Sequence, residues 1–310
     1  MKNNPDKVIV WGVGKGYWKL HNLLKFHESI GDIKIIAYVS KYKETKYING
    51  FEVFEPWEFQ KKNLNYQYIL VTTDNFYKEI IKEYGEKLHI DRKKFLKASV
   101  LNIPFFNWKK YIKIYNSGLS IISEVCFGGI LSNHLGLALN SPFVNVRIGT
   151  KKNDFFEFLK NMNKYMLESP SLECSKYNET NSWCGEEFGR IEYPLLQYDN
   201  IMLHGFHYKT QNDFFEDWEK RRKRYNFQNN IVFKILYDEK DIEEFEKIPF
   251  TYKLGFYYKE TEYNNIISIP FDEVQNAYFW MTYINYITIS GEIFNYVDFF
   301  ELLSDSVLDM

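Results

Sequence analysis

The chain has 310 residues, enough for two domains of ordinary size. Its 39 basic and 41 acidic residues give a net charge of −2, so the protein has no global field that would attract nucleic acid or a membrane surface. Hydrophobic residues make up 45% of the chain, as in a globular protein. The aromatic content of 19% indicates either a biased genome or aromatic platforms for sugar or base rings.

The cysteine count and the hydropathy of the chain indicate in which cellular compartment the protein works. Cys126, Cys174 and Cys184 are odd in number and have no paired spacing, which favours a reducing compartment without a disulfide framework. The N-terminus lacks the apolar region of a signal peptide, and no apolar run reaches the ~18 residues of a membrane span. We therefore expect a cytoplasmic protein without an integral membrane segment.

The first hundred residues alternate between apolar strands and amphipathic helices. We predict strands at 7–11, 33–39, 51–54 and 68–71, and helices at 17–27, from Pro56 onward and at 76–84. This alternation is typical of a parallel sheet, and Asn49-Gly50 predicts a hairpin turn. The fold class predicted for the whole chain is α/β, with two Rossmann-like three-layer α/β/α domains of mainly parallel sheets, at 1–103 and 104–310.

A glycine turn follows the first strand. Gly12, Gly14, Lys15 and Gly16 lie between a strand and a helix, where backbone N–H groups can hold the phosphate of a nucleotide or nucleotide-sugar. The alternative is that the glycines only allow the strand and helix to pack closely. NAD is disfavoured because the second strand ends in Ser40, where a dinucleotide fold usually has an acid for the ribose.

This first segment is similar to the Rossmann-like domain that precedes sugar-modifying enzymes of bacterial surface-polysaccharide assembly. The similar stretches are V-I-V-W-G-V-G-K-G, I-A-Y-V-S, I-N-G-F-E-V-F-E-P and Y-I-L-V-T-T. That group commonly has Asp at the position of Ser40. The resemblance implies a nucleotide- or sugar-nucleotide-binding domain.

The second half begins with another strand, turn and helix. A strand at 119–123 leads into Cys126, Gly128 and Gly129, and a helical pattern follows. A thiol near a helix N-terminus can form a reactive thiolate, so Cys126 is a candidate catalytic residue, and the two glycines are candidates for anion binding. The alternative is that Cys126 is inert packing.

Residues 200–225 carry two histidines and a cationic helix. His204 ends a strand at 201–203, where open α/β sheets bind ligands, and His207 follows three residues later. Either histidine can act as an acid, a base or a phosphate contact, or can be structural. No further ligand lies at metal spacing, so we expect no metal. Thr210 with Asp213 predicts the start of a helix at 211–225.

Two arginines and one acid complete the candidate residues. Arg221 and Arg222 lie on the 211–225 helix and can bind an anion, or belong to a solvated face. Asp238 follows a strand at 231–237 and can act as a catalytic base, contact a ribose or bind a metal-phosphate. The alternative is that it is the N-cap of a helix at 239–247. Residues 169–193 are an irregular excursion or a hairpin.

Residues 119–257 resemble DUF1919, a bacterial family of unknown function often labelled as exopolysaccharide or capsule biosynthesis proteins. The similar stretches include S-I-I-S-E-V-C-F-G-G, D-N-I-M-L-H-G-F-H-Y-K-T and W-E-K-R-R-K-R-Y-N, although the family usually has Asn-Asn in place of Glu124-Val125. The resemblance implies a protein of surface-polysaccharide assembly acting on a nucleotide-sugar or phosphorylated glycan, by transfer of a glycosyl or other group. The alternative is a non-catalytic nucleotide- or sugar-binding module that binds a protein partner. The aromatic C-terminal region, from residue 266, is either core or a homo-oligomer interface.

Overall fold

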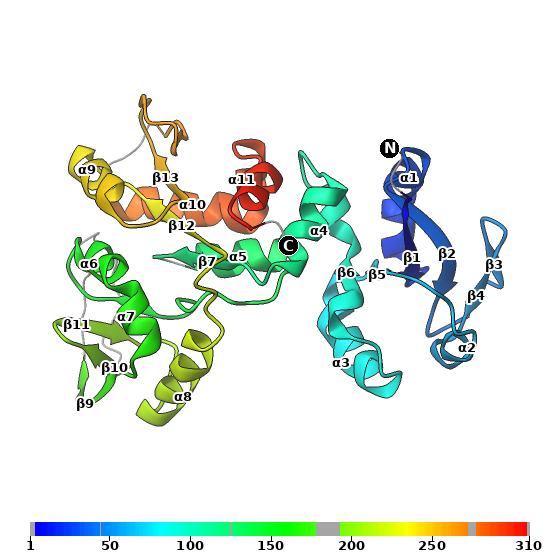
Figure 1. The fold of residues 1–310 in the computed structure, drawn as a ribbon, viewed down its shortest axis with the longest axis horizontal. Coiled ribbons are helices and arrows are strands. Elements are labelled where there is room, and N and C mark those ends of the chain that lie inside the picture. Colours follow the sequence, from blue (N-terminus) through cyan, green and yellow to red (C-terminus); the bar gives the residue numbers. More distant parts are fainter. Residues whose placement is uncertain (1–3, 44, 125, 178–192, 272–276, 309–310) are drawn as a thin grey trace. The chain divides into compact units, whose positions relative to one another are not determined.

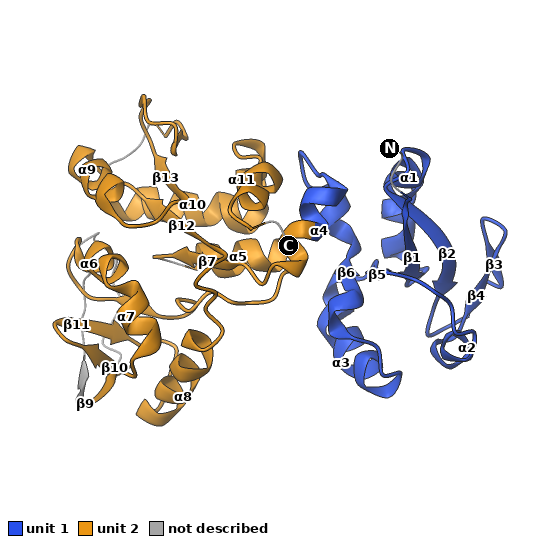
Figure 2. Cartoon of the chain, in the orientation of Figure 1, with its two compact units in different colours: residues 1–112 blue, residues 113–310 orange. Residues whose placement is uncertain are grey.

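The computed structural model describes residues 4–43, 45–124, 126–177, 193–271 and 277–308. The chain divides into two compact units, residues 1–112 and 113–310 (Figure 2). Each unit contains a sheet of mainly parallel strands, so the predicted α/β class with mainly parallel sheets is confirmed (Figure 1).

The first unit has a six-stranded sheet in the order β3-β4-β2-β1-β5-β6. All its neighbouring strands are parallel except β3 and β4, which form a hairpin. The predicted Asn49-Gly50 turn joins them, with positive φ angles of 48° and 82°. The strands are β1 (Asp6–Trp11), β2 (Ile33–Val39), β3 (Tyr47–Ile48), β4 (Phe51–Phe54), β5 (Tyr68–Val71) and β6 (Phe95–Lys97).

Amphipathic helices connect these strands. Pro56 occupies the first turn of its helix, as predicted, and the side chains of Glu55 and Glu58 form a capping box there. The α-helices are α1 (Lys15–Ser29), α2 (Pro56–Lys61) and α3 (Tyr77–Lys87), and α4 (Trp108–Asn116) spans the boundary between the units. The short 3₁₀ helices are η1 (Asp74–Phe76), η2 (Arg92–Lys94) and η3 (Ala98–Asn102).

The second unit contains a four-stranded sheet in the order β14-β13-β12-β7, in which every pair is parallel. Ser123 at the end of β7 is in register with Phe233 of β12, so the carboxyl ends of these two strands lie side by side. The strands are β7 (Ser120–Ser123), β12 (Asn230–Ile235), β13 (Lys253–Tyr257) and β14 (Ile266–Ser268).

A second sheet in this unit is antiparallel, in the order β8-β11-β10-β9. The strand predicted at 201–203 lies in this antiparallel sheet, so the expectation that it belongs to an open parallel sheet is wrong. The rule about carboxyl strand ends therefore does not apply to His204. The strands are β8 (Arg147–Ile148), β9 (Ser171–Tyr177), β10 (Tyr193–Tyr198) and β11 (Ile201–His204).

Both sheets of the second unit share one core, in which Ile122 and Val232 of the parallel sheet cluster with Leu203 of the antiparallel sheet. Thr210 caps α8, as predicted, because its side chain accepts the N–H of Asp213. The helices are α5 (Phe127–His134), α6 (Asp154–Lys160), α7 (Met162–Leu167), α8 (Gln211–Arg222), α9 (Glu239–Lys247), α10 (Ala277–Ser290), η4 (Glu292–Asn295) and α11 (Phe299–Asp305).

Candidate functional site

The glycine turn of the first unit combines close packing with an open helix N-terminus. Gly12 has φ +95°, and its carbonyl accepts the Thr72 hydroxyl at 2.7 Å. A Cβ on Gly16 would lie 2.1 Å from the Thr72 carbonyl oxygen, so this glycine lets α1 approach β5. At Gly14, the N-cap of α1, a Cβ would meet nothing within 4 Å, and Lys15 beside it is exposed. Gly12 and Gly16 thus shape the turn, and Gly14 and Lys15 face solvent.

The end of β2 carries no acid. The Ser40 hydroxyl donates to the Tyr42 carbonyl at 2.9 Å, and the Ser40 N–H donates to the Phe54 carbonyl. The hydroxyl and the N–H of Ser40 are therefore both hydrogen-bonded to backbone carbonyls of the first unit.

Cys126 in the second unit is exposed and borders a pocket of about 430 Å³. It is the N-cap of α5, one residue before Phe127. Other lining residues are Gly129, Ile130, Asn133, His134, Leu139, Val144, Asn145 and Ile289. Cys126 and Gly129 therefore line one pocket. The pocket lining that the structure describes does not include the two candidate histidines.

Gly128 has a packing role instead of the predicted anion contact. Its N–H donates to the Ser123 hydroxyl at 2.9 Å. The residue is buried, and a Cβ there would lie 2.8 Å from the Ile121 carbonyl oxygen. Because its N–H is already bonded and covered, Gly128 holds α5 against β7.

An ion pair lies at the carboxyl ends of β7 and β12. Lys234 Nζ is 2.5 Å from Glu124 Oε2 and donates to the Ile235 carbonyl at 2.8 Å. The Lys234 side chain is fully buried, and that of Glu124 is 15% exposed. The ammonium also lies 5.1 Å and 5.0 Å from the ring centroids of Phe156 and Tyr237. The lysine thus holds the carboxylate from the protein interior.

A second charged group follows β12. Lys152 Nζ lies 2.5 Å from Asp238 Oδ2 and 3.0 Å from Asp241 Oδ1. Burial alone would lower the pKa of Lys152, but the hydrogen bonds to the two aspartates raise it overall. Burial alone would raise the pKa of Asp238, but the hydrogen bond from Lys152 lowers it overall. Asp238 also accepts the Asp241 N–H as the N-cap of α9, which is one of its predicted roles.

The two histidines differ in their surroundings. His204 has no exposed surface, and its Nδ1 is 3.3 Å from the Tyr193 hydroxyl. Burial, with a contribution from the positive charge of Arg147, lowers the pKa of His204 to about 4. His204 is therefore neutral near pH 7. His207 is exposed in the turn between β11 and α8.

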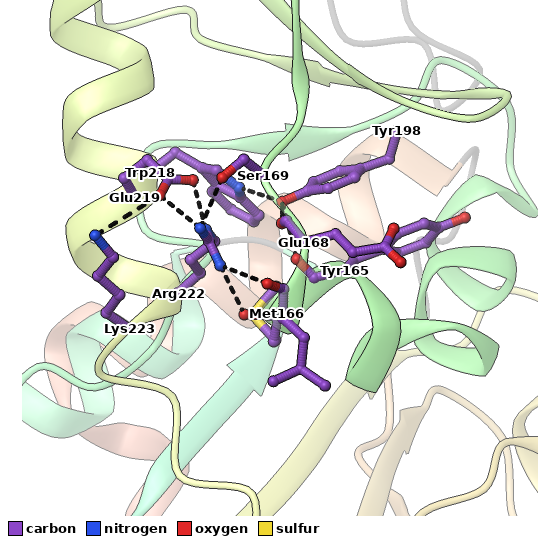
Figure 3. A network of polar contacts seen from close by, with 10 residues as sticks. Tyr165, Met166, Glu168, Ser169, Tyr198, Trp218, Glu219, Arg222 and Lys223 are labelled. Carbon is purple, nitrogen blue, oxygen red and sulfur yellow. Dashed lines mark hydrogen bonds and ion pairs between the residues drawn. The ribbon is translucent and has the colours of Figure 1, made fainter.

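Arg222 is bonded on all five of its N–H donors, as Figure 3 shows. Nε and Nη2 donate to the Glu219 carboxylate at 2.5 Å and 2.6 Å, and Nη2 also donates to the Ser169 hydroxyl at 2.8 Å. Nη1 donates to the Met166 and Leu167 carbonyls at 3.1 Å each. The guanidinium thus ties α8 to the end of α7, which replaces the predicted anion contact with a structural role.

Arg221 is also engaged within the unit. Its guanidinium donates to the Val144 carbonyl and, at 2.5 Å, to the Tyr208 hydroxyl. The side chain is only 10% exposed, and Asp217 lies 3.7 Å away as a counter-charge. These contacts favour a structural role over the predicted binding of an external anion.

Sequence motifs do not predict a site role for Glu124, Lys234, Lys152 or Asp241. The signal in the sequence is Lys234, a single charge within the apolar run I-V-F-K-I-L, most of which forms β12. Such a lysine must be paired, because burying an isolated charge is costly. Among the residues that the structure describes, no group of three or more His, Cys, Asp or Glu could hold a metal ion.

The fold and these charged groups define an α/β protein with two parallel-sheet units and ionisable side chains at strand ends. The chain belongs to the family described as a domain of unknown function (DUF1919), whose model matches residues 97–303. Residues 4–96 match a second family model, C2185-like, N-terminal. An uncharacterized protein of Haemophilus influenzae is 25% identical over 178 residues, covering 56% of this chain and 74% of that protein. None of the helices in the described part of the chain has the length and apolar character needed to cross a membrane.

Proposed function

We propose that the protein is a cytoplasmic group-transfer enzyme of surface-polysaccharide assembly that acts on a nucleotide-sugar or a phosphorylated glycan. The exposed turn at Gly14 and Lys15 suits a phosphate, because no side chain caps the N-terminus of α1 and Lys15 adds a positive charge. The local bonding of Ser40 favours a ligand other than NAD.

The Glu124–Lys234 pair carries this proposal. A buried ion pair is often no more stable than apolar residues of the same size, so its presence calls for a functional reason. Glu124 lies at the carboxyl end of a parallel strand, where α/β folds bind ligands. Lys234 binds one carboxylate oxygen and thereby fixes the orientation of the other.

In this mechanism Glu124 is the general base. A hydroxyl oxygen of the acceptor attacks the anomeric carbon of the donor sugar, and the bond from that carbon to the phosphate oxygen breaks. The phosphate leaves with the electron pair, and the hydroxyl proton passes to Glu124. Cys126, exposed at its pocket, is a second candidate for ligand contact.

Turnover assays with sugars linked to UDP, GDP, CMP and dTDP test the proposal. We expect Glu124→Gln to lower kcat by about a hundredfold, because the amide accepts no proton. Glu216→Gln on α8 is the matched control, since that carboxylate is exposed on the same unit. Wild-type turnover in Glu124→Gln would show that Glu124 is not the general base. Wild-type turnover in both Cys126→Ala and His207→Ala would show that neither residue acts in the site.

A non-catalytic binding module is the second candidate function. It is favoured by the surroundings of His204, because this candidate catalytic residue is buried and neutral near pH 7. This reading expects a ligand-induced rise in melting temperature with the same sugar nucleotides but no product from any of them.

A further inference from the structure

A pocket of about 540 Å³ lies at the amino ends of β7 and β12, the opposite end of the sheet from Glu124. Gly118, two residues before β7, lines it together with residues 224–228, which precede β12. None of the residues discussed so far as catalytic or phosphate-binding lines this pocket within the described part of the chain.

Asparagine side chains fix the pocket wall. Asn226 Nδ2 donates to the carbonyls of Ser117 and Gly118 at 3.2 Å and 3.3 Å, and Asn226 Oδ1 accepts the Gln228 N–H at 3.0 Å. Asn140 Nδ2 donates to the same Gly118 carbonyl at 2.9 Å. The wall is therefore preformed, which reduces the ordering cost of binding a small ligand.

Tyr225 lines the pocket with an unsatisfied polar atom. The residue is 5% exposed, and its hydroxyl has no hydrogen-bond partner in the part of the chain that the structure describes. Burial raises the pKa of Tyr225, so the hydroxyl stays protonated and can donate. Buried polar groups are nearly always paired. Because this hydroxyl has almost no exposed surface, a ligand oxygen becomes its partner only if the side chains around the hydroxyl move.

The other lining side chains indicate the chemistry of the ligand. Phe227 is 43% exposed, and its ring lies 4.8 Å from that of Tyr225 in an edge-to-face contact. Arg224 is exposed and is the one charged residue among the described residues of the lining. An aromatic face suits a sugar ring, the exposed Gln228 amide suits its hydroxyls, and a guanidinium suits a carboxylate or phosphate.

We infer that this pocket binds a sugar that carries an anionic group, either a carboxylate or a phosphate. The inference goes beyond the proposed group transfer, because it concerns a separate site that needs neither a nucleotide nor Glu124. A site of this kind would let the protein hold an acidic or phosphorylated glycan away from the carboxyl edge of the sheet.

Binding of glucuronate, glucose 6-phosphate and neutral glucose to the full chain, followed by protein-observed NMR at up to about 10 mM sugar, tests the inference. We expect at least one anionic sugar to bind, and Arg224→Met to weaken that binding by about 10- to 100-fold, the scale of a charge-assisted hydrogen bond. The better of the two anionic sugars identifies the group that the pocket recognises. Lys223→Met is the matched control, because Lys223 is exposed on the same helix end but does not line the pocket.

Tyr225→Phe provides a second readout. The variant should melt at a higher temperature, because it removes a buried unpaired hydroxyl, and should bind the anionic sugar several-fold more weakly. Phe227→Ala should also weaken binding, whereas Tyr263→Ala, an exposed aromatic outside the pocket, should not. Three results would each overturn the inference: no binding of either anionic sugar, equal binding of glucose, or unchanged affinity in both Arg224→Met and Tyr225→Phe. None of them bears on turnover at Glu124.

Discussion

At the residue scale, Lys234 is a charged side chain at a position where an apolar side chain would be expected to stabilise the fold more. Val232, two residues earlier in β12, and Leu236, which directly follows the strand, belong to the hydrophobic core. An apolar residue at position 234 would extend that core, yet the chain buries an ammonium and pairs it with Glu124. Removing one partner of such a pair leaves an uncompensated charge, whereas removing both does not.

We therefore predict opposite results for single and double variants of this pair. Lys234→Met should lower the free energy of unfolding by roughly 3 kcal/mol, because Glu124 loses its counter-charge. The double variant Glu124→Leu/Lys234→Met should regain most of that loss and should be inactive. Urea unfolding measures both variants. A double variant as unstable as the single one would mean that the Glu124–Lys234 ion pair stabilises the fold.

The buried His204 predicts how stability depends on pH. Its folded-state pKa is about 4, and in the unfolded chain it returns to its usual value near 6.5. The unfolded state therefore binds the proton more readily, so stability is full above pH ~6.5 and falls as the pH drops toward ~4, by at most about 3 kcal/mol.

Urea unfolding between pH 7.5 and 5 measures this dependence. His204→Gln should show a shallower loss of stability over that range than the wild type. His207→Gln, which changes an exposed histidine nearby, should keep the wild-type slope. Parallel curves of stability against pH for the wild type and His204→Gln would contradict the lowered pKa of His204 as the cause of the loss.

At the scale of elements, the glycine turn of the first unit contains two glycines with different surroundings. Gly16 packs against Thr72, whereas Gly14, two residues earlier, faces open space. Gly16→Ala would place a Cβ against the Thr72 carbonyl and push α1 away from β5. We predict a loss of about 2 kcal/mol or more for this variant. Gly14→Ala is the matched control, because a Cβ there meets nothing within 4 Å and φ is −82°.

Thermal unfolding of both variants checks this prediction. Gly14→Ala should melt within a few degrees of the wild type, whereas Gly16→Ala should melt clearly lower. If the two variants lost stability equally, the loss would come from the residue type and not from the contact with Thr72.

Many turns and helix starts could be predicted from the sequence, because the residues that fix them act on the backbone only a few positions away. The Asn49-Gly50 turn, Pro56 and the Thr210 cap each fix their own backbone, and all three are found as predicted. Strand direction could not be predicted in this way. The apolar run of β11 reads the same beside a parallel or an antiparallel neighbour, and the choice depends on contacts with β8 and β10, distant in sequence.

The candidate site was predictable only in part, for the same reason. Cys126 and Gly129 lie close in sequence, and they share a pocket. Glu124 and Lys234 are 110 residues apart, so no local spacing connects them. The donors of Arg222 are taken by residues 53 to 56 positions away as well as by Glu219, and a cationic run alone does not reveal such partners.

For the whole molecule, α10 presents an uncharged outer face. Tyr286 and Ile289 are 60% and 63% exposed, and the helix has no charged residue over its 14 positions. If this face joins two copies, as proposed for the aromatic C-terminal region, like charges would not oppose the pairing. Tyr286→Lys should then shift the protein from dimer to monomer.

Light scattering after size-exclusion chromatography measures that shift. Trp57→Lys, which changes an exposed aromatic of the first unit, should leave the mass unchanged. A wild-type monomer at all concentrations would exclude self-association through α10.

The insertion of the antiparallel sheet between β7 and β12 has a consequence for how the chain folds. Ser120 and Asn230 pair across more than a hundred intervening residues, and the antiparallel sheet lies within that loop. Closing so long a loop costs entropy that is recovered only when the strands meet, so this pairing should form late and slowly. During synthesis β7 would leave the ribosome well before its partner, so the edge that pairs with β12 would stay unpaired until β12 arrives.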